Sequence, residues 1–230
     1  MKIFAAMNIL LVSATDMEIA PFRDAYLSKA ASGSKGPEIR FLTSGIGMLA
    51  TAARLTAALQ QFKPDLVIQA GIAGSFSNNH ALGSVYRVAS DVIADMGVTE
   101  NGEWKDVFDL CLEDSDSPPY YGGMLKAIEP GFLDLNHIPQ VIGVTVNTIT
   151  TDPGRIEILK WKYSPDLESM EGAAFHFVCI ENGIPFVQLR AVSNYIGERN
   201  KANWQIREAV SNLNETLSGI IDQLVVAKTS

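Results

Sequence analysis

Cysteine and histidine are scarce in this chain of 230 residues. Its two cysteines, Cys111 and Cys179, form no disulfide framework, and this low number is typical of a reducing compartment such as the cytoplasm. The three histidines, His80, His137 and His176, lack metal-ligand spacing, and His176 lies in an apolar helical pattern where a core residue is expected. The scarcity of both residue types therefore predicts a cytoplasmic protein without a metal site.

Basic residues and long hydrophobic runs are also lacking. The 18 Lys and Arg residues are outnumbered by 26 Asp and Glu residues, which gives a net charge of −8. A protein that binds nucleic acid needs a basic face instead. No segment approaches the roughly 18 consecutive apolar residues of a membrane-spanning helix. We therefore expect neither nucleic acid nor a membrane as a partner.

The N-terminal stretch "MKIFAAMNILLVSATDMEIA" begins with one lysine and an apolar run, as a secretion signal does. However, Asn8 interrupts this run, and no cleavage site of small residues precedes a polar segment. We therefore interpret "NILLVSA" as a buried first strand, and both Met1 and Met7 remain open as the first residue of the protein.

Hydrophobic residues make up 47% of the chain and charged residues 19%, which is typical of a globular protein. The length predicts a single domain over residues 1–230. Short apolar runs predict strands at Asn8–Ser13, Glu38–Thr43, Leu66–Ala70, Ser84–Ile93, Gln140–Val146 and Pro185–Val192. Longer patterns predict helices at Asp16–Ser28, Met48–Phe62, Asp152–Lys162, Ser169–Asn182 and Asn203–Val226. Apolar strands that alternate with amphipathic helices indicate an α/β layered fold, with a sheet covered on both faces.

The stretch 97–139 is the least regular part of the sequence. It contains "DSDSPPYYGG" and is rich in glycine, aspartate and proline, which favour loops over helices and strands. We expect it to run over the surface as an irregular excursion or flap, not as a linker between two domains.

Two glycine-containing loops follow predicted strands. "SGIGMLA" matches the dinucleotide-binding pattern through Gly45, Gly47 and Ala50, but the acidic residue Asp65 begins the next strand instead of ending it. The loop also follows the second predicted strand instead of the first. A nicotinamide or flavin site is therefore not expected. "QAGIAGSF" ends a buried strand, where its glycines allow either a tight turn or the close approach of a ligand.

The segment "LESMEGAAF" places Glu171 before a run of small residues. Glutamate is almost never fully buried without a partner, so Glu171 either faces water at a helix start or accepts hydrogen bonds from a ligand in a pocket. The segments that contain Glu18, Glu171 and Asn194 are expected to meet at one edge of the sheet. Two carboxylates and an amide at one edge of a sheet suit a site that cleaves a bond without a metal.

The ordered set "SGIG", "GIAG", "SMEGAA" and "RAVSN", with the early acidic "DMEI", resembles the nucleoside phosphorylase and nucleosidase family. It is similar to the methylthioadenosine/S-adenosylhomocysteine nucleosidases over nearly the whole chain except 97–139. "VNTITT", "SMEGAAF" and "QLRAVSNYIGERNKANW" resemble the futalosine hydrolases within that family. The resemblance implies a three-layer sandwich with a central mixed twisted sheet, a nucleoside substrate and no cofactor. It also implies a homodimer or higher homo-oligomer, in which a neighbouring subunit helps to close the 5′ side of the pocket.

The resemblance also implies roles for individual residues. Glu171 matches the carboxylate that accepts hydrogen bonds from ribose hydroxyls, and Met170 matches the residue that packs against the sugar. Glu18 matches the carboxylate that orients and deprotonates the attacking water. Thr148 and Ile149 match the segment whose backbone reads the purine edge. A carboxylate near the oxocarbenium-like sugar of glycosidic cleavage stabilises its charge.

Asn194 departs from the adenine-releasing relatives, which have aspartate at this position to protonate N7 of the leaving base. An amide donates hydrogen bonds to N7 or O6 but transfers no proton. A 6-oxopurine presents two acceptors on that edge, so Asn194 favours hypoxanthine as the leaving group. Adenine stays open, because the amide oxygen can accept from an amino group.

Ile72 follows Gly71 in the segment where phosphorylases of this family often supply polar groups for phosphate, so hydrolysis is preferred. Arg199 or Lys201 can pair with the carboxylate on the 5′ side of futalosine, although a solvated charge fits both residues equally well. Three alternatives stay open: phosphorolysis of a 6-oxopurine nucleoside such as inosine, hydrolysis of methylthioadenosine or S-adenosylhomocysteine, and nucleoside binding without catalysis.

Overall fold

The protein is described by a computed structural model that covers residues 7–33 and 36–226. The expectation that concerned the first residues, with Met1 as a possible start, lies outside the described residues. In the part of the chain that is described, no helix is long and apolar enough to cross a membrane.

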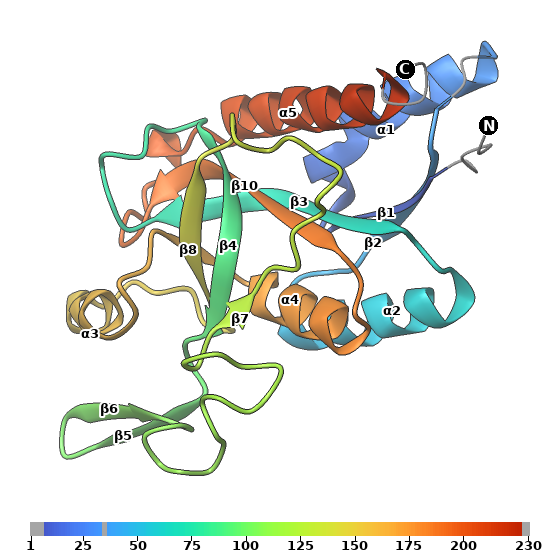
Figure 1. The fold of residues 1–230 in the computed structure, drawn as a ribbon. Coiled ribbons are helices and arrows are strands. Elements are labelled where there is room, and N and C mark those ends of the chain that lie inside the picture. Colours follow the sequence, from blue (N-terminus) through green and yellow to red (C-terminus); the bar gives the residue numbers. More distant parts are fainter. Residues whose placement is uncertain (1–6, 34–35, 227–230) are drawn as a thin grey trace.

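A mixed sheet of eight strands lies at the centre of the protein (Figure 1). Its strands are β1 (Asn8–Ser13), β2 (Glu38–Thr43), β3 (Leu66–Ser75), β4 (Val85–Ile93), β7 (Leu125–Lys126), β8 (Gln140–Thr145), β9 (Leu167–Ser169) and β10 (Phe186–Tyr195). β10 pairs with both β3 and β4, so β3, β9, β8, β4 and β10 close into a ring. β1 and β2 extend the sheet beyond β3, and β7 pairs with β4.

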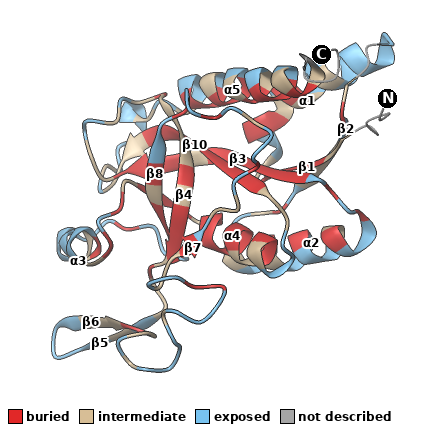
Figure 2. Cartoon of the chain, in the orientation of Figure 1, coloured by how far each residue is buried: buried red, intermediate tan, exposed pale blue. Residues whose placement is uncertain are grey.

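Helices cover both faces of the sheet, which gives three layers (Figure 1). α1 (Asp16–Ala31) and α5 (Ile206–Val226) lie on one face, and α2 (Met48–Gln61) and α4 (Gly172–Glu181) lie on the other. The alternation along β1 shows the consequence: Ile9 and Leu11 pack in the core cluster with α1 and α5, whereas Leu10 packs with α2 and α4. Buried residues accordingly fill both interfaces (Figure 2). The predicted α/β sandwich with a mixed central sheet is confirmed.

The third strand is longer than predicted, and the interpretation of "QAGIAGSF" as a strand-ending loop is wrong. β3 continues through Gly71 and Gly74 because β10 runs parallel beside it as far as Ser75. A Cβ atom at Gly71 would lie 2.5 Å from Nη1 of Arg190, and one at Gly74 would lie 2.5 Å from Cδ1 of Ile196. These glycines therefore admit neighbouring side chains to the sheet instead of forming a turn.

The predicted helix Ser169–Asn182 is partly wrong at its start. Leu167–Ser169 form β9, a short strand between β3 and β8, and α4 begins only at Gly172. A Cβ atom at Gly172 would overlap the carboxylate of Asp91, so the start of α4 packs directly on the sheet. Glu171 therefore occupies the helix start, but only 5% of its surface is exposed, which excludes the water-facing alternative.

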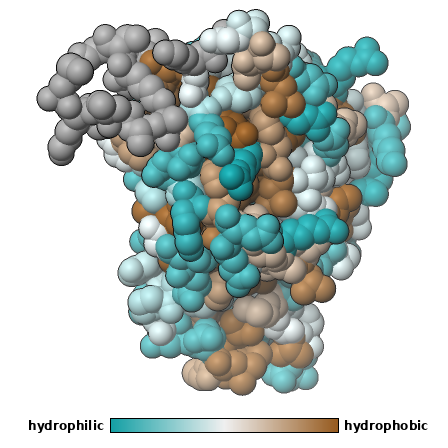
Figure 3. Space-filling model, turned by 90° about the vertical axis from the view of Figure 1, so that its right-hand side faces the viewer, coloured by the Kyte–Doolittle hydropathy of each residue, from teal (hydrophilic) through white to brown (hydrophobic). Residues whose placement is uncertain are grey.

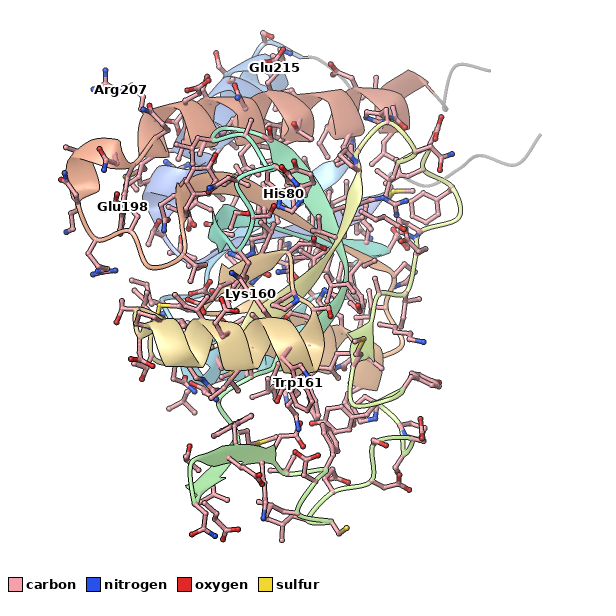
Figure 4. The ribbon with its side chains drawn as sticks, turned by 90° about the vertical axis from the view of Figure 1, so that its left-hand side faces the viewer. His80, Lys160, Trp161, Glu198, Arg207 and Glu215 are labelled. Carbon is pink, nitrogen blue, oxygen red and sulfur yellow. The ribbon has the colours of Figure 1, made fainter. Side chains whose placement is uncertain are left out.

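The stretch 97–139 is more ordered than predicted. It contains β5 (Gly97–Glu100) and β6 (Glu103–Asp106), which form a hairpin, and it supplies β7 to the main sheet. The hairpin is held to α3 (Pro153–Tyr163), because the Tyr163 hydroxyl donates to Asp106 and Lys162 pairs with the same carboxylate. Figure 4 shows α3, with Lys160 and Trp161, between the body of the protein and this hairpin.

Hydrophilic residues cover much of the face shown in Figure 3, and hydrophobic residues surface between them. The exposed large hydrophobic side chains include Met17, Ile46 and Leu49, which follow the carboxyl ends of β1 and β2. The candidate active site lies at these ends of the strands.

Candidate active site

A cavity of about 330 Å³ opens at the carboxyl ends of β1, β3, β9 and β10. This is the edge at which open α/β folds bind ligands. Its lining includes seven of the residues singled out in the sequence: Glu18, Ile72, Ile149, Met170, Glu171, Asn194 and Arg199. The tertiary structure therefore brings together side chains from five separate segments of the chain.

Three further candidates do not line this cavity. Gly71 lies beneath it, where the absence of a side chain leaves room for Arg190 and for Oε1 of Glu18. Thr148 and Lys201 are exposed on the loops after β8 and β10. Of the predicted purine-edge pair, the structure thus places Ile149 at the cavity but not Thr148.

Glu18 lies in the first turn of α1 and is buried. Its Oε1 accepts from the Ile72 amide at 3.1 Å, and Oε2 accepts from the Thr15 amide at 2.8 Å and the Thr15 hydroxyl at 3.0 Å. Burial raises the pKa of this carboxyl group above its usual value, while the positive charge of Arg190 and the hydrogen bonds oppose that rise. A buried carboxylate with a raised pKa is suited to accept a proton near neutral pH.

Glu171 faces the same cavity from the start of α4. Its Oε1 accepts from the Gly47 amide at 3.1 Å, and Oε2 lies 3.4 Å from Nη1 of Arg190. Gly47 belongs to the loop after β2 and has a positive φ of 92°, a conformation that glycine adopts without strain. The loop "SGIG" therefore acts here through a backbone donor that orients a carboxylate.

Arg190, on β10, was missed in the sequence analysis. Its Nη1 faces Glu171 and the Ile72 carbonyl, and Nη2 donates to Oε1 of Gln69 at 3.0 Å. The side chain is buried, and a buried arginine inside an apolar strand requires acidic or polar partners. A charged residue within the apolar strand segment of "QLRAVSN" is therefore the sequence signal that could have identified Arg190.

A polar layer beneath Arg190 fixes the start of α4. The Thr145 hydroxyl donates to Asp91 at 2.8 Å and accepts from the Ala173 amide at 2.7 Å. The Gln188 amide, oriented by its partners, donates to Nε2 of His176 at 2.7 Å and to Asp91. Burial lowers the pKa of His176 to about 4, so it is the neutral core residue that the sequence predicted.

The Asn194 amide has a defined orientation. Its Nδ2 donates to the Tyr195 carbonyl at 3.1 Å, and its Oδ1 accepts from the Ser193 hydroxyl at 2.9 Å. The reverse orientation would oppose the amide oxygen to the Tyr195 carbonyl, so the nitrogen must lie on that side. Nδ2 carries a second hydrogen, and a ligand in the cavity that Asn194 lines can accept it.

Apolar and basic side chains form the rim of the cavity. Met17 and Ile46 line it with exposed fractions of 57% and 63%. Arg199 and Trp204 line it from the loop after β10, and the guanidinium carbon of Arg199 lies 5.6 Å from the Trp204 ring centroid. The loop is organised by Glu198 (Figure 4), which accepts from the Asn200 amide and the Asn203 side chain, both at 2.6 Å.

The arrangement combines a carboxylate that can accept a proton, a second carboxylate held by a buried guanidinium, and an amide that presents a free N–H. Glu168 also lines this cavity. The sequence analysis missed it, because its segment was interpreted as the start of a helix. Water activation, stabilisation of a cation and a hydrogen bond to a leaving group are thus available in one cavity.

The chain is similar to known proteins over most of its length. A family model described as the phosphorylase superfamily matches residues 8–225 of this chain. Futalosine hydrolase from Thermus thermophilus is 30% identical over 209 residues, which cover 89% of this chain and 91% of that protein. 5′-Methylthioadenosine/S-adenosylhomocysteine nucleosidase from Anoxybacillus flavithermus is 26% identical over 237 residues, covering 95% of this chain and 99% of that protein.

The fold has counterparts among solved structures. The native structure of futalosine hydrolase from Helicobacter pylori superposes with a TM-score of 0.76 at 17% identity, over 95% of this chain and 99% of that one. At this identity the likeness shows the fold alone. Together with the sequence matches, it confirms the resemblance that "SGIG", "SMEGAA" and "RAVSN" indicated.

Proposed function

The chain belongs to the phosphorylase superfamily, and we propose that it is a nucleosidase that hydrolyses the N-glycosidic bond of futalosine and releases hypoxanthine. Both relatives reported above are nucleosidases or hydrolases by name, which supports N-glycosyl hydrolysis as the class of reaction. The finer assignment to futalosine is favoured by the 30% identity to the Thermus thermophilus enzyme. Such an enzyme serves the alternative pathway to menaquinone.

The observation that carries the proposal is the oriented amide of Asn194 in the cavity that Glu18 and Glu171 share. Because Nδ2 donates only one of its two hydrogens to the Tyr195 carbonyl, the amide can offer its other N–H to a ligand. Such a donor stabilises the negative charge that develops on N7 or O6 of a departing 6-oxopurine. A hypoxanthine leaving group fits this arrangement without a proton donor at position 194.

In the proposed reaction, the Glu18 carboxylate takes a proton from water as the water oxygen bonds to C1′ of the ribose. The C1′–N9 bond breaks, and its electron pair leaves with the purine, where the Asn194 amide stabilises the charge. Glu171 accepts hydrogen bonds from the ribose hydroxyls and stabilises the oxocarbenium-like sugar, against which Met170 packs. The purine then takes up a proton from solvent and Glu18 releases to solvent the proton it accepted, so the products are free hypoxanthine and the sugar, and Glu18 is ionised again.

Electrostatics support hydrolysis over phosphorolysis. Three lining residues are carboxylates, Glu18, Glu168 and Glu171, and they would repel a phosphate anion. The buried Arg190 already faces Glu171, and among the described lining residues Arg199 at the rim is the one basic side chain. Ile72 stands where phosphorylases of this family often supply a polar group for phosphate, and its backbone amide donates to Glu18.

The exposed apolar rim supports the proposal of a homodimer. Met17 and Ile46 line the cavity, and Leu49 follows on α2 with 84% of its surface exposed. A second subunit that covers these side chains would also close the cavity from water. Analytical ultracentrifugation of the wild type and of Leu49→Glu tests this: the wild type is expected as a dimer, with a weakened association in the variant.

Incubation with futalosine, inosine and methylthioadenosine, each with and without phosphate, tests the function. We expect release of hypoxanthine from futalosine at the same rate in both conditions, and undiminished activity with a chelator. A strict phosphate requirement would identify a phosphorylase. Faster release of adenine from methylthioadenosine than of hypoxanthine from futalosine would identify an adenine nucleosidase. Binding without turnover of any of the three would identify a nucleoside-binding protein.

A further inference from the structure

Two buried glutamines lie side by side on neighbouring strands. Gln69 of β3 and Gln188 of β10 are partners in the register of these parallel strands, and both are almost fully buried. The residues next to them along each strand are apolar, so the two amides need partners inside the protein. Arg190 lies two residues after Gln188 and therefore points to the same face of the sheet. Its guanidinium is the partner that both amides share.

Each nitrogen of the Arg190 guanidinium faces an acceptor. Nε donates to the side-chain oxygen of Gln188 at 3.0 Å, and Nη2 donates to Oε1 of Gln69 at 3.0 Å. Nη1 faces Oε2 of Glu171 at 3.4 Å and the Ile72 carbonyl at 3.3 Å. A guanidinium is planar and rigid, so acceptors on Nε and Nη2 also determine where Nη1 points.

His176 determines the direction of the Gln188 amide. The Leu125 carbonyl can only accept, so Nδ1–H of His176 donates to it at 2.9 Å, and Nε2 of the neutral ring carries no hydrogen. Nε2 therefore accepts from the Gln188 nitrogen at 2.7 Å. With its nitrogen towards His176, Gln188 must present its oxygen to Arg190.

Gln69 retains a buried donor without a partner. Its oxygen accepts from Arg190, but within residues 7–33 and 36–226 no group accepts a hydrogen bond from Nε2. An unpaired buried donor lowers stability, and an apolar side chain of similar size, such as methionine, would avoid that cost. Packing therefore does not require an amide at position 69. What the amide supplies is an acceptor for Nη2 of Arg190.

We propose that Gln69 and Gln188 are positioning residues for the reaction, which hold the Arg190 guanidinium against the two carboxylates of the site. This inference rests on the proposed function, which assigns water activation to Glu18 and stabilisation of the sugar cation to Glu171. Neither glutamine lines the cavity, so both act through Arg190 and not on the substrate. A guanidinium released from these amides can rotate, and Glu171 then loses the fixed geometry in which it meets the sugar.

Gln69 is the residue to change, because in the described part of the chain its side chain has a single hydrogen bond, to Arg190. The Gln188 amide has three partners, so its replacement puts the fold at risk. Gln69→Met keeps the size of the side chain and removes the acceptor. We expect kcat on futalosine to fall by about 10-fold and KM to change by less than about 3-fold, because the charges act mainly in the transition state. The urea midpoint should stay close to that of the wild type, because the unpaired donor is removed as well.

Gln69→Glu is the conservative variant. It keeps an oxygen for Nη2 of Arg190 and loses only the unpaired donor, so kcat should remain within about 3-fold of the wild type. A residue that merely fills the core predicts the reverse order, because methionine suits a buried position better than a carboxylate does. Gln61→Met, exposed at the end of α2, is the matched control and should change neither kcat nor the urea midpoint.

NMR of labelled arginine side chains reports on Arg190 without a substrate. Hydrogen exchange of its guanidinium should be at least about 10-fold faster in Gln69→Met than in the wild type and in Gln69→Glu. Unchanged exchange in a folded Gln69→Met variant would overturn the inference. Full kcat in Gln69→Met despite faster exchange would overturn it as well, since the hold on Arg190 would then have no part in the reaction.

Futalosine turnover by the wild type separates this inference from the proposed function. Turnover by the wild type with unchanged exchange in Gln69→Met leaves the function standing and removes the positioning role. Faster exchange in Gln69→Met without turnover by the wild type supports the hold on Arg190 and removes futalosine as substrate. No turnover together with unchanged exchange contradicts both.

Discussion

The guanidinium of Arg190 lies 3.4 Å from Oε2 of Glu171, and both side chains are almost fully buried. A buried carboxylate is tolerated because this positive charge and the Gly47 amide share its oxygens. The same guanidinium acts on Glu18, where its charge opposes the rise in pKa that burial causes. The positive charge of Arg190 thus acts on both carboxylates that take part in the proposed reaction, Glu18 and Glu171.

Glu171→Gln should lower kcat on futalosine by about 10²–10⁴-fold, because a carboxylate beside a developing cation contributes roughly 3–5 kcal/mol to the transition state. The side-chain NH2 of the introduced glutamine would face the N–H of either Gly47 or Arg190, and that donor would lose its acceptor. The free energy of unfolding should therefore fall by about 1–3 kcal/mol. Release of hypoxanthine and urea unfolding measure the two effects. Glu181→Gln, exposed at the end of α4, is the control. Near-normal turnover in a folded Glu171→Gln variant would remove Glu171 from the site.

Glu18 should set the acid limb of the pH profile. The proposed base must be ionised, and burial raises its pKa, so kcat/KM should fall on acidification at a pH above the ordinary value of 4.5. Glu18→Gln should lower turnover by about 10²–10⁴-fold and lack this limb, while substrate still binds. Profiles of kcat/KM from pH 4 to 9 measure both, with Glu215→Gln, an exposed glutamate on α5, as the control. A wild-type limb that persists unchanged in Glu18→Gln would assign it to another group.

Asn194→Asp should change which base is released. The introduced carboxyl group faces the Tyr195 carbonyl, which favours its protonated form and makes it an acid able to serve adenine. Futalosine turnover should fall by about 10²-fold, if the lost hydrogen bond contributes about 3 kcal/mol in the transition state. The analogue of futalosine that carries adenine should lose less, or gain.

The ratio of kcat/KM for the two substrates is the quantity to compare, because specificity depends on differential binding in the transition state. Asn78→Asp, an exposed position after β3, is the control for added charge. An equal loss on both substrates would mean that Asn194 shapes the cavity without choosing the base.

Arg199→Ala should raise KM for futalosine by up to about 5-fold and leave KM for inosine unchanged. Arg199 lines the cavity at its rim, where it can pair with the 5′ carboxylate that inosine lacks. The effect is small because an exposed ion pair contributes about 0–1 kcal/mol. Lys201→Ala is the matched control, because Lys201 lies outside the cavity lining. An unchanged KM for futalosine in Arg199→Ala would indicate that Arg199 is a solvated charge without a binding role.

Asp91 should make the protein less stable as the pH rises from 4 to 7. Burial raises its pKa from 3.8 to about 6, so the folded state holds a proton that the unfolded state has already lost. Stability from this group is fully present below pH 3.8 and is lost as the pH rises through about 6, by roughly 3 kcal/mol. His176, with its pKa lowered to about 4, acts in the opposite sense.

Urea unfolding of the wild type and Asp91→Asn between pH 4 and 8 isolates the Asp91 contribution, because both proteins share His176. The difference in unfolding free energy between them should change by roughly 3 kcal/mol over this range in favour of the variant. Asp222→Asn, an exposed aspartate on α5, should run parallel to the wild type. A constant difference between wild type and Asp91→Asn would contradict the raised pKa.

The order of helices and strands was readable from the sequence, because each element buries one face against a core and so carries a local period of apolar residues. β1 and α2 are examples: both lie where the pattern placed them, the first with identical bounds. Motif order also pointed to Glu18, Glu171 and Asn194 through short recognisable segments, and the structure brings these three residues to one cavity.

What only the tertiary structure decided was the environment of these residues. β3 extends through Gly71 and Gly74 because β10 lies beside it, and this pairing joins positions more than a hundred residues apart. The burial of Arg190 against Glu171, and of Glu168 across Gly74 from Asn194, depends on the closure of the strand ring. A local pattern records which face of an element is apolar, but contacts between distant strands depend on register and closure, which no single segment encodes.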